Sequence, residues 1–468
     1  MPRFLSLFLL FFLFLTSGTC YALMSIDQEA QLGQQVLEML RKKDVFITDP
    51  EITNYINRVG QRIVAHVGPH YFPFRFFVVQ DNSINAFAVP GGLVFINSGL
   101  IEIVDREDEL AGVIAHELAH VQCRHLAKRI EKLSHLNLAT AAVTIAALLL
   151  SRGQGANIIA TTTNALAITQ ALAYSRADEE EADRQAFEYL VKAGYDPRGM
   201  IEIFNKIVRH SWLLADNAPS YLLTHPTTPE RISYLESLIK NYPPKESYHS
   251  HNLLLRRVQI RLRVITHDPG SLILRYRQCI RENPKDPLLH YGLALALARM
   301  HRYPEALKEM HYVLKALPKE DMFQVDLGRL YFEATEYKKA LKIFKAYVIQ
   351  HPQDPTARYF LARTYLALKQ YPRALEIFKG LGPSLRYNPD YHYFLGQLYA
   401  QLGQKGQAHY QWAQYFLLTG DRQVALYHLR KAYQMLPQKD PLRARIALQL
   451  KSVQLDKNSR KGAPGKGE

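Results

Sequence analysis

The sequence predicts two domains of different fold class: an α+β domain that is mostly helical with a small sheet, and an all-α solenoid of repeats that follows it. The chain has 468 residues, more than one hydrophobic core can organise. Segments with helical and strand-like apolar spacing share the first half, whereas a fixed period runs through the second half. We therefore place the first domain at residues 23–240, a linker at 241–252 and a repeat domain at 253–453.

Residues 1–22 have the pattern of a secretory signal peptide. An arginine precedes an apolar run that starts at Phe4 and would form a helix of about 18 Å, too short for a hydrocarbon core of about 30 Å. Small residues follow the run, which predicts cleavage after Ala22 and export of the mature chain. A threonine stands directly before Cys20, a poor match to a lipid-attachment sequence, so we do not expect a lipoprotein anchor.

The composition is that of a globular protein with an excess of positive charge. Apolar residues make up 48% and charged residues 22%, and 58 Lys and Arg against 43 Asp and Glu give a net charge of +15. This charge suits an anionic membrane surface, and no nucleic-acid-binding motif accompanies it. We expect a membrane-proximal protein with no nucleic-acid partner. Export leaves Cys123 and Cys279 in the mature chain, and the sequence leaves open whether they pair.

The first domain is expected to combine helices with a hairpin. Apolar residues recur at helical spacing between residues 25 and 67, with a break at 48–50, which predicts two helices. The segment FRFFVVQD at 74–81 is aromatic and β-branched and predicts a strand. A Pro-Gly-Gly turn at 90–92 between two apolar segments then predicts a hairpin.

An apolar run, LATAAVTIAALLL, occupies residues 138–150. As a helix it would be about 20 Å long, too short to cross a bilayer. We interpret it as one arm of a helical hairpin that covers the first domain. The alternative is a half-exposed hairpin that touches the membrane or guards a cleft, with residues 153–155 as its hinge.

The second half repeats at a step of 34 residues. Leucines and alanines keep this step in phase, at Leu293, Leu327, Leu361 and Leu395 and at Ala306, Ala340, Ala374 and Ala408. This period, with prolines between units, is typical of tetratricopeptide repeats, whose concave groove binds peptides or proteins. Residues 253–286 resemble a degenerate first unit and 421–453 a C-terminal cap. Residues 454–468 have nothing to bury and are expected to form a disordered tail.

The segment AGVIAHELAHVQ, residues 111–122, carries the chemistry predicted for the first domain. It contains His116, Glu117 and His120 in an H-E-x-x-H array among apolar residues. The four-residue step puts both histidines on one helix face, about 6 Å apart along the axis, so both can bind one metal ion. Glu117 lies one position further round, where its carboxylate can act as the general base of a zinc protease.

A third metal ligand is expected downstream. The metzincin pattern is excluded, because the position six residues after the second histidine is Leu126. In the acidic segment YSRADEEEADR, Glu179 and Asp183 are four apart on one helix face. Glu179 would complete a His2Glu zinc set with one open position, and Asp183 would hold the far nitrogen of a ligating histidine. We interpret Glu180 and Glu181 as a solvated acidic face.

H-E-x-x-H followed by S-R-x-x-E-x-E-A-D resembles the zinc metallopeptidase family that includes the HtpX heat-shock protease and the CAAX prenyl endopeptidase. The similarity runs from about Asp27 to near Gly420 and so includes the repeats, which periplasmic members of the family also carry. The resemblance implies a zincin-like fold for the first domain, one zinc ion per subunit and a location in the periplasm.

The resemblance also assigns a substrate-binding role. In this family a similar N-A-x-A-x-P-G-G segment is the edge strand beside the zinc, which implies that Asn85, Ala86, Phe87 and Ala88 pair with an extended substrate. Packing alone would also explain Phe87.

Two residues further along match a family pattern near the active site, namely the histidine of T-H-P and a later arginine. These are His225 and Arg231, which the resemblance makes candidates for control of the metal. The imidazole of His225 could fill the open zinc position. The alternative is that His225 is an ordinary loop histidine.

These observations predict a zinc-dependent endopeptidase of the cell envelope. By resemblance its clients are unfolded or misassembled proteins, above all of the outer membrane. The repeats would recruit clients or contact the outer-membrane assembly machinery. The protein could also act as a chaperone in the assembly of outer-membrane proteins. The alternative is a non-catalytic assembly factor with a latent or structural zinc site. Retention of Glu117 argues against that alternative, because a structural site needs no base.

Overall fold

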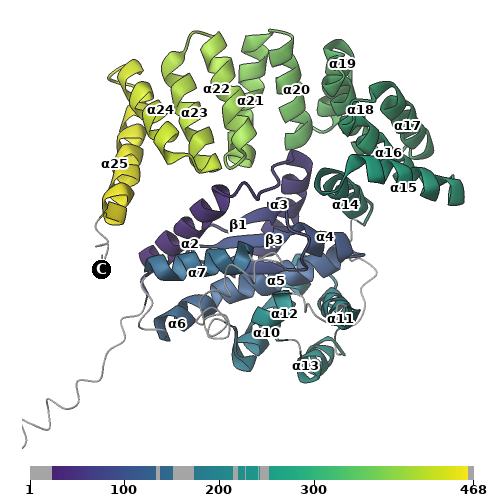
Figure 1. The fold of residues 1–468 in the computed structure, drawn as a ribbon, viewed down its shortest axis with the longest axis vertical. Helices are drawn as coiled ribbons and strands as arrows, with labels where there is room; N and C mark the ends of the chain where they lie inside the picture. The colour runs from purple at the N-terminus through teal and green to yellow at the C-terminus, as the bar shows by residue number, and fades with distance from the viewer. Residues whose placement is uncertain are drawn as a thin grey trace, which may run out of the picture.

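The computed structural model describes residues 24–132, 138–150, 173–213, 220–226, 228–240, 242 and 252–461. The expected signal peptide, the hinge at 153–155 and most of the expected linker lie outside these ranges. In the described part, a mixed α/β domain forms the first half and a row of paired helices forms the second (Figure 1). The predicted fold class is therefore confirmed.

A three-stranded sheet lies at the centre of the first domain. Its strands are β1 (Arg75–Val79), β2 (Ala86–Val89) and β3 (Leu93–Asn97), in the order β1-β3-β2. β2 and β3 form the predicted antiparallel hairpin, whose turn depends on the positive φ of Gly91 (92°) and Gly92 (81°). β1 pairs with β3 in parallel, so β2 occupies one edge of the sheet.

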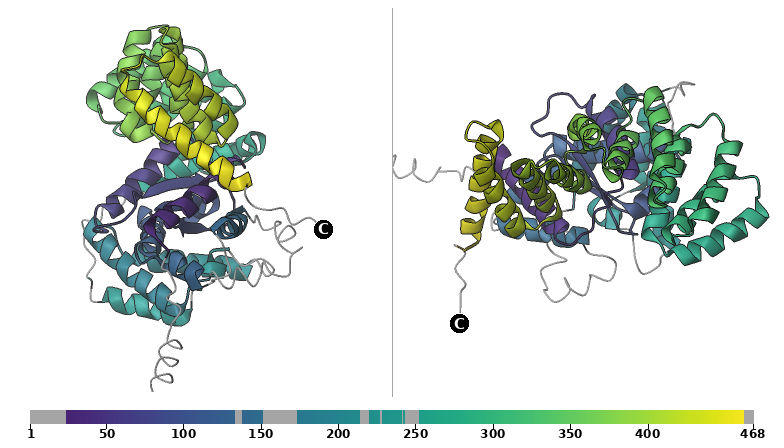
Figure 2. Two further views of the ribbon diagram at one scale, coloured as in Figure 1. Left: turned by 90° about the vertical axis from the view of Figure 1, so that its left-hand side faces the viewer. Right: turned by 90° about the horizontal axis from the view of Figure 1, so that it is seen from above.

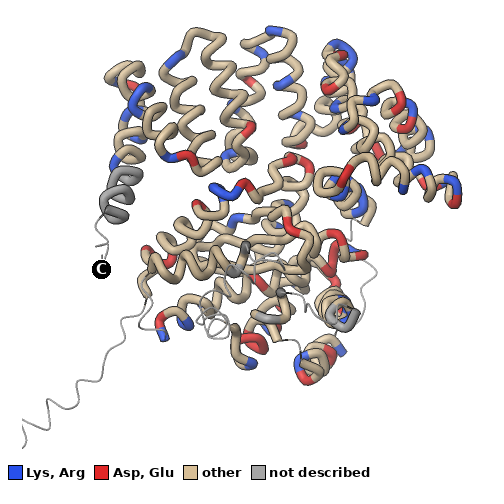
Figure 3. The backbone as a smooth tube through the Cα atoms, in the orientation of Figure 1, with Lys and Arg blue, Asp and Glu red and all other residues tan. Residues whose placement is uncertain are grey.

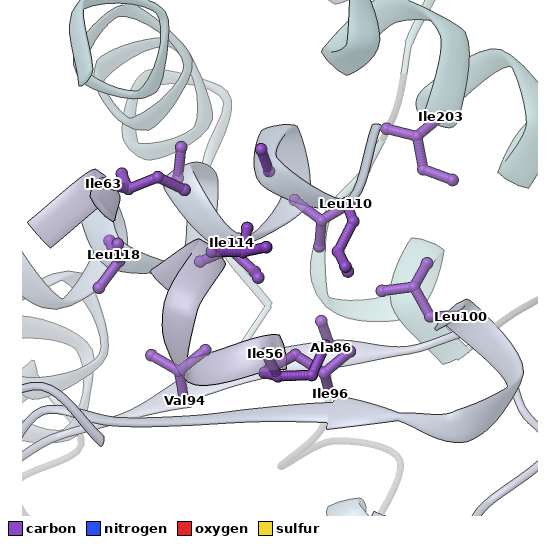
Figure 4. Close-up of a cluster of buried hydrophobic side chains, with 14 of the residues drawn as sticks. Ile56, Ile63, Ala86, Val94, Ile96, Leu100, Leu110, Ile114, Leu118 and Ile203 are labelled. Atoms are coloured by element: carbon purple, nitrogen blue, oxygen red, sulfur yellow. The ribbon is translucent and has the colours of Figure 1, made fainter. Parts of the chain in front are cut away.

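Helices surround this sheet. They are α2 (Ile26–Arg41), α3 (Pro50–Val64), α4 (Ser98–Ile103), α5 (Glu107–Gln122), α6 (His125–Lys132), α7 (Leu138–Leu150), α10 (Arg176–Ala193), α11 (Arg198–Leu213), α12 (Ser220–Thr224) and α13 (Pro229–Lys240). Figure 4 shows the core where α3 and α5 meet the sheet, with Ile56, Ile114 and Val94 among its side chains.

α5 is the most deeply buried helix of this domain, although it begins with three acidic residues, all of them buried. Glu107 forms an ion pair with Arg58 at 2.7 Å, and Glu109 forms one with Lys206 at 2.7 Å. Asp108 accepts a hydrogen bond of 2.9 Å from the backbone N–H of Asp196. Negative charge at a helix N-terminus is favourable, and here each carboxylate also has a partner. α5 is thus fixed at one end before its histidines are reached.

The apolar run at 138–150 forms α7, which packs on α2. Ala142, Ile145 and Ala146 of α7 share a buried cluster with Val36 and Leu37 of α2. Within the described ranges, we find no helix that combines the length and the apolar character needed to cross a bilayer. The described arm of the expected hairpin therefore covers the first domain, as predicted.

The second half consists of helix pairs stacked side by side (Figures 1 and 2). They are α14 (Asn252–Thr266) with α15 (Pro269–Glu282), α16 (Pro287–Arg299) with α17 (Tyr303–Ala316), α18 (Met322–Glu333) with α19 (Tyr337–Gln350), α20 (Pro355–Ala367) with α21 (Tyr371–Leu385), α22 (Pro389–Gln401) with α23 (Lys405–Thr419), and α24 (Arg422–Met435) with α25 (Pro441–Lys461). Charges of both signs are distributed along these helices (Figure 3).

The sequence period corresponds to this helix pairing. The four periodic leucines lie on the first helix of a pair and the four periodic alanines on the second, and all are buried. Gly328 shows why small residues recur: a Cβ atom there would lie 2.6 Å from the ring of Phe344 in the paired helix. The last helix, α25, continues to Lys461, past residue 454, where a disordered tail is expected, because no proline or glycine interrupts it before Gly462.

The two halves share an interface that centres on α14. Leu255, Val258 and Leu262 of α14 belong to the core of the first domain, whereas Ile260 and Val264 belong to the core of the repeats. The helix expected to open the repeat domain therefore also completes the first domain, which the period alone could not reveal.

Buried charges cross this interface. Arg257 of α14, which is 1% exposed, bonds to Asp326 of α18 at 2.8 Å and pairs with Glu51 of α3. Arg261 also pairs with Asp326, and Arg329 of α18 lies 2.7 Å from the side chain of Asp49. Burial alone would raise the pKa of Asp326, but the charges of Arg257 and Arg261 outweigh it and hold that pKa below its usual value.

We expect Asp326→Ala to lower the free energy of unfolding by about 3–5 kcal/mol, because it leaves two arginines buried without their shared carboxylate. Denaturant unfolding of the full chain measures this. Glu305→Ala is the matched control, since Glu305 pairs with Arg302 on the solvent-exposed surface and should change nothing measurable. Equal stability of the two variants would contradict the structural role of the network.

Candidate metal centre

α5 brings His116, Glu117 and His120 to the middle of the first domain. All three side chains are at most 2% exposed. The helix reaches this position because apolar residues between and around them pack against α3, α10 and the sheet. The sequence prediction of a buried H-E-x-x-H helix is therefore confirmed at the level of structure.

α10 supplies the downstream carboxylates. It begins after Ser175, whose side chain caps the helix together with Asp178, and it ends at Gly194, which adopts a left-handed conformation with φ of 75°. Glu179 and Asp183 lie one turn apart on the face that meets α5, and both are buried. The carboxylates therefore face the two histidines.

Two histidines and one glutamate converge on a single point. The Nε2 atoms of His116 and His120 lie 2.9 Å apart, and the two carboxylate oxygens of Glu179 lie 3.4 Å from one each. His225 joins them, with its Nδ1 atom 3.0 Å from Glu179. The ligand atoms of these four buried residues all lie within 4.8 Å of one another, so they could together hold a metal ion.

Asp183 and Arg231 contact the candidate metal ligands and hold them in position. Asp183 lies 2.9 Å from Nδ1 of His116, which makes Nδ1 the donor and leaves Nε2 free to bind a metal. Arg231 of α13 binds Asp183 through Nε at 2.6 Å and Nη2 at 2.8 Å, and also pairs with Glu179. Arg231 therefore fixes both carboxylates, a role that the sequence alone did not assign to it.

The electrostatics of the site suit a cation. Burial and the charge of Arg231 would lower the pKa of His116, but Glu179 and Asp183 outweigh them and raise it to about 9. Burial would raise the pKa of Glu179, but the nearby His225, Arg231 and His116 hold it well below its usual value. Two imidazoles and the ionised carboxylate of Glu179 are a donor set that fits a divalent metal ion.

Glu117 is set apart from the ligands. Burial raises the pKa of its carboxyl group, against the opposing charges of His225 and His116. Its carboxylate is fully buried, and Nε2 of His225 lies 3.4 Å from one of its oxygens. A buried carboxyl group with a raised pKa beside a candidate metal site indicates a task in handling protons.

The far side of His120 contains partners that the sequence analysis missed. Nδ1 of His120 lies 2.9 Å from Nδ1 of His125, the first residue of α6. Nε2 of His125 lies 3.1 Å from Glu181, so the interpretation of Glu181 as only a solvated carboxylate is wrong. Acidic residues in a row gave no signal that one of them turns back toward α6.

The edge strand β2 lies beside the centre. Ala88 lines a small pocket together with His120 and Tyr174, and the ring of Tyr174 stacks on His120 with centroids 3.9 Å apart. Ala86, Phe87 and Ala88 belong to β2, and Asn85 directly precedes it. The sequence-predicted substrate strand is therefore near the candidate ligands.

An H-E-x-x-H helix, a glutamate from a second helix and a small sheet define a metallopeptidase-like domain, here joined to a helical-repeat solenoid. Comparison with family models agrees: residues 50–239 match the model of peptidase family M48, and residues 331–402 match that of a tetratricopeptide repeat. Residues 50–239 are therefore an M48 peptidase domain, and residues 331–402 belong to a tetratricopeptide-repeat region.

Curated relatives match this chain over 185 to 315 residues. The putative beta-barrel assembly-enhancing protease of Vibrio cholerae is 33% identical over 304 residues, covering 64% of this chain and 63% of that protein. The beta-barrel assembly-enhancing protease of Escherichia coli is 30% identical over 315 residues, covering 65% and 64%. The mitochondrial metalloendopeptidase OMA1 of Schizosaccharomyces pombe is 31% identical over 185 residues, covering 39% and 52%. The matches thus span less than two thirds of each relative's length.

We expect Asp183→Ala to weaken metal affinity by about 10- to 100-fold, because His116 loses the acceptor that fixes its tautomer. Competition with a chromophoric chelator measures the affinity. Glu180→Ala, at an exposed position of the same helix, is the control and should leave it unchanged. If Asp183→Ala removed the metal as completely as Glu179→Ala, the roles of ligand and supporting carboxylate would have to be exchanged.

Proposed function

We propose that this protein is a zinc-dependent endopeptidase of the cell envelope that cleaves misfolded or misassembled proteins, those of the outer membrane in particular. The observation that carries the proposal is the convergence of His116, His120 and Glu179 next to the buried carboxylate of Glu117. His116, His120 and Glu179 are the ligands of one zinc ion per chain, and Glu117 is the catalytic base. A structural zinc site would have no use for this base.

Zinc bound by two histidines and a glutamate acidifies a water molecule and polarises the carbonyl of a peptide bond. Glu117 takes the proton from the attacking water and passes it to the leaving amine, for which a carboxyl group with a raised pKa is suited. Asp183 holds His116 in the tautomer that presents Nε2, and Arg231 keeps Asp183 and Glu179 in place. The chain's own residues thus supply orientation and proton transfer.

An extended substrate pairs with β2. Among the described strands, none pairs with the other edge of β2, so its main-chain groups are the ones that a sequence-tolerant substrate would pair with. The side-chain oxygen of Asn85 is buried without a hydrogen-bond partner in the described part of the chain, which supports a polar contact to the substrate there. Asn85 to Ala88 thereby form the substrate-binding strand.

The repeats recruit clients and connect the enzyme to the outer-membrane assembly machinery. Relatives named for enhancing β-barrel assembly match this chain over 304 and 315 residues, which supports both the client class and a periplasmic location. The repeats and the peptidase domain also enclose a cavity of about 650 Å³, lined by β1, α3 and the loop before α22. It lies at the opposite edge of the sheet from β2, so a client segment held there would leave the substrate strand accessible.

Wild-type protein with zinc should cleave an unstructured peptide, whereas Glu117→Gln should lose at least about 1,000-fold in kcat, because it removes the base without removing a ligand. Zinc content separates the two effects: Glu117→Gln keeps one tightly bound ion, and His116→Ala and Glu179→Ala lose it. Glu180→Gln is the matched control and should cleave normally. A cleavage rate retained in Glu117→Gln would support the non-catalytic alternative.

His225 restrains the enzyme at rest. Its ring is 1% exposed, stacks on Tyr221 at 4.5 Å and reaches Glu179 and Glu117 at 3.0 and 3.4 Å. This position allows the imidazole to occupy the fourth zinc coordination site and exclude water until a client engages. All four candidate ligands are buried, which supports a movement of His225 when a substrate binds.

We expect His225→Ala to raise the basal cleavage of an unstructured peptide several-fold and to promote self-cleavage, because the competing ligand is gone. Peptide turnover and the integrity of the purified chain over time are the measurements. His66→Ala, an exposed histidine after α3, is the control. An unchanged rate with intact zinc content would leave His225 as an ordinary buried loop residue.

A further inference from the structure

A second group of metal-binding residue types lies directly behind the first. Cys123 follows α5, His125 opens α6 and Glu181 lies on α10, and one ligand atom from each comes within 4.8 Å of the others. His125 is 1% exposed, whereas Cys123 and Glu181 are half-buried. An ion could therefore reach this group from solvent without passing through the catalytic centre.

The three side chains are held together by protons that a metal ion would replace. Nε2 of His125 lies 3.1 Å from a carboxylate oxygen of Glu181, and Sγ of Cys123 lies within 4.8 Å of both residues' ligand atoms. Burial, with the charge of Glu181, raises the pKa of Cys123 to about 11, so the thiol keeps its proton in the resting protein. The Sγ atom of Cys123, the Nε2 atom of His125 and a carboxylate oxygen of Glu181 therefore lie close together, with hydrogen atoms between them that a metal ion would replace.

We propose that Cys123, His125 and Glu181 form a second, inhibitory site for a thiophilic divalent ion such as zinc. Thiolate, imidazole and carboxylate are all zinc ligands, and three of them leave one position for water. Binding releases the thiol proton to solvent and shifts the single proton of the neutral His125 imidazole from Nε2 to Nδ1. No electron transfer is involved.

His125 links the two sites and makes them compete. This step rests on the proposed role of His120 as a ligand of the catalytic ion through Nε2. His120 then carries its proton on Nδ1 and donates it to Nδ1 of His125, 2.9 Å away. His125 can accept this bond only while its own proton is on Nε2, where it donates to Glu181.

An ion on Nε2 of His125 reverses that arrangement. The neutral imidazole then carries its proton on Nδ1, which points at the N–H of His120, so two donors face each other. Either the bond that orients His120 is lost or the ring of His125 turns away. Because coupling between sites is reciprocal, the second ion weakens the catalytic site and is itself bound more weakly while that site is filled.

The test uses the full-length chain, stripped of metal and titrated with zinc and, in parallel, with cobalt(II). Calorimetry counts the sites, and thiolate-to-cobalt charge-transfer absorption in the near ultraviolet reports ligation by cysteine. Cys123→Ser is the test variant, and Cys279→Ser is the matched control, because Cys279 is the other cysteine in the described part of the chain. Thermal melting confirms that both variants fold.

We expect wild type and Cys279→Ser to bind two ions, the second about 10-fold or more weaker, with the thiolate absorption appearing only with the second. Cys123→Ser should bind one ion without that absorption. Excess zinc should inhibit peptide cleavage by wild type and Cys279→Ser, and should spare Cys123→Ser. Glu181→Gln provides a second test at the binding level and should also lose the second ion.

A single site in wild type without thiolate absorption would overturn the proposal, and so would identical titrations of wild type and Cys123→Ser. His116→Ala separates this proposal from the proposed function. Thiolate absorption that persists in His116→Ala supports the second site whatever the enzyme's activity. Absence of peptide cleavage by every form, with two ions still bound, would contradict the proposed function and leave the second site standing.

Discussion

The peptidase domain depends on keeping a cluster of opposite charges buried at its centre. Glu179 and Asp183 are ionised in an otherwise apolar setting, and Arg231 bonds to both of them. Burying charge is costly unless each group is paired and hydrogen-bonded, so loss of one member would leave the others uncompensated. The arrangement is retained because it fixes His116 and Glu179 with their metal-binding atoms pointing at one place.

The same physical device recurs where the two domains meet. Arg257 and Arg261 lie between the start of α3, through its capping residue Asp49 and Glu51, and Asp326 of the repeats. α14, which carries both arginines, contributes to both hydrophobic cores. The repeat solenoid is therefore an integral part of the fold rather than a freely attached module. α3, which carries this interface, also packs against α5, so the interface and the metal centre share one core.

Much of this arrangement follows from local spacing in the sequence. A four-residue spacing predicted that His116 and His120 share one helix face, and that Glu179 and Asp183 share a face of another helix. A 34-residue period predicted where the repeat helices lie. What local spacing could not predict are contacts between segments far apart in the chain. The contacts of Arg231, the bond between His125 and Glu181, and the double role of α14 all depend on tertiary packing. His225 was found only through resemblance, since a histidine beside a proline has no periodic signal of its own.

The central claim is that His116, His120 and Glu179 hold one catalytic zinc ion, with His225 at its fourth position in the resting state. Anomalous diffraction at the zinc absorption edge, from crystals of the full-length chain with one equivalent of zinc, tests this directly. The account predicts a single peak about 2.0–2.2 Å from Nε2 of His116, Nε2 of His120 and a carboxylate oxygen of Glu179, with His225 completing the tetrahedron. A peak that lacks any of the first three ligands, or that lies at Cys123 while this centre is empty, would contradict it.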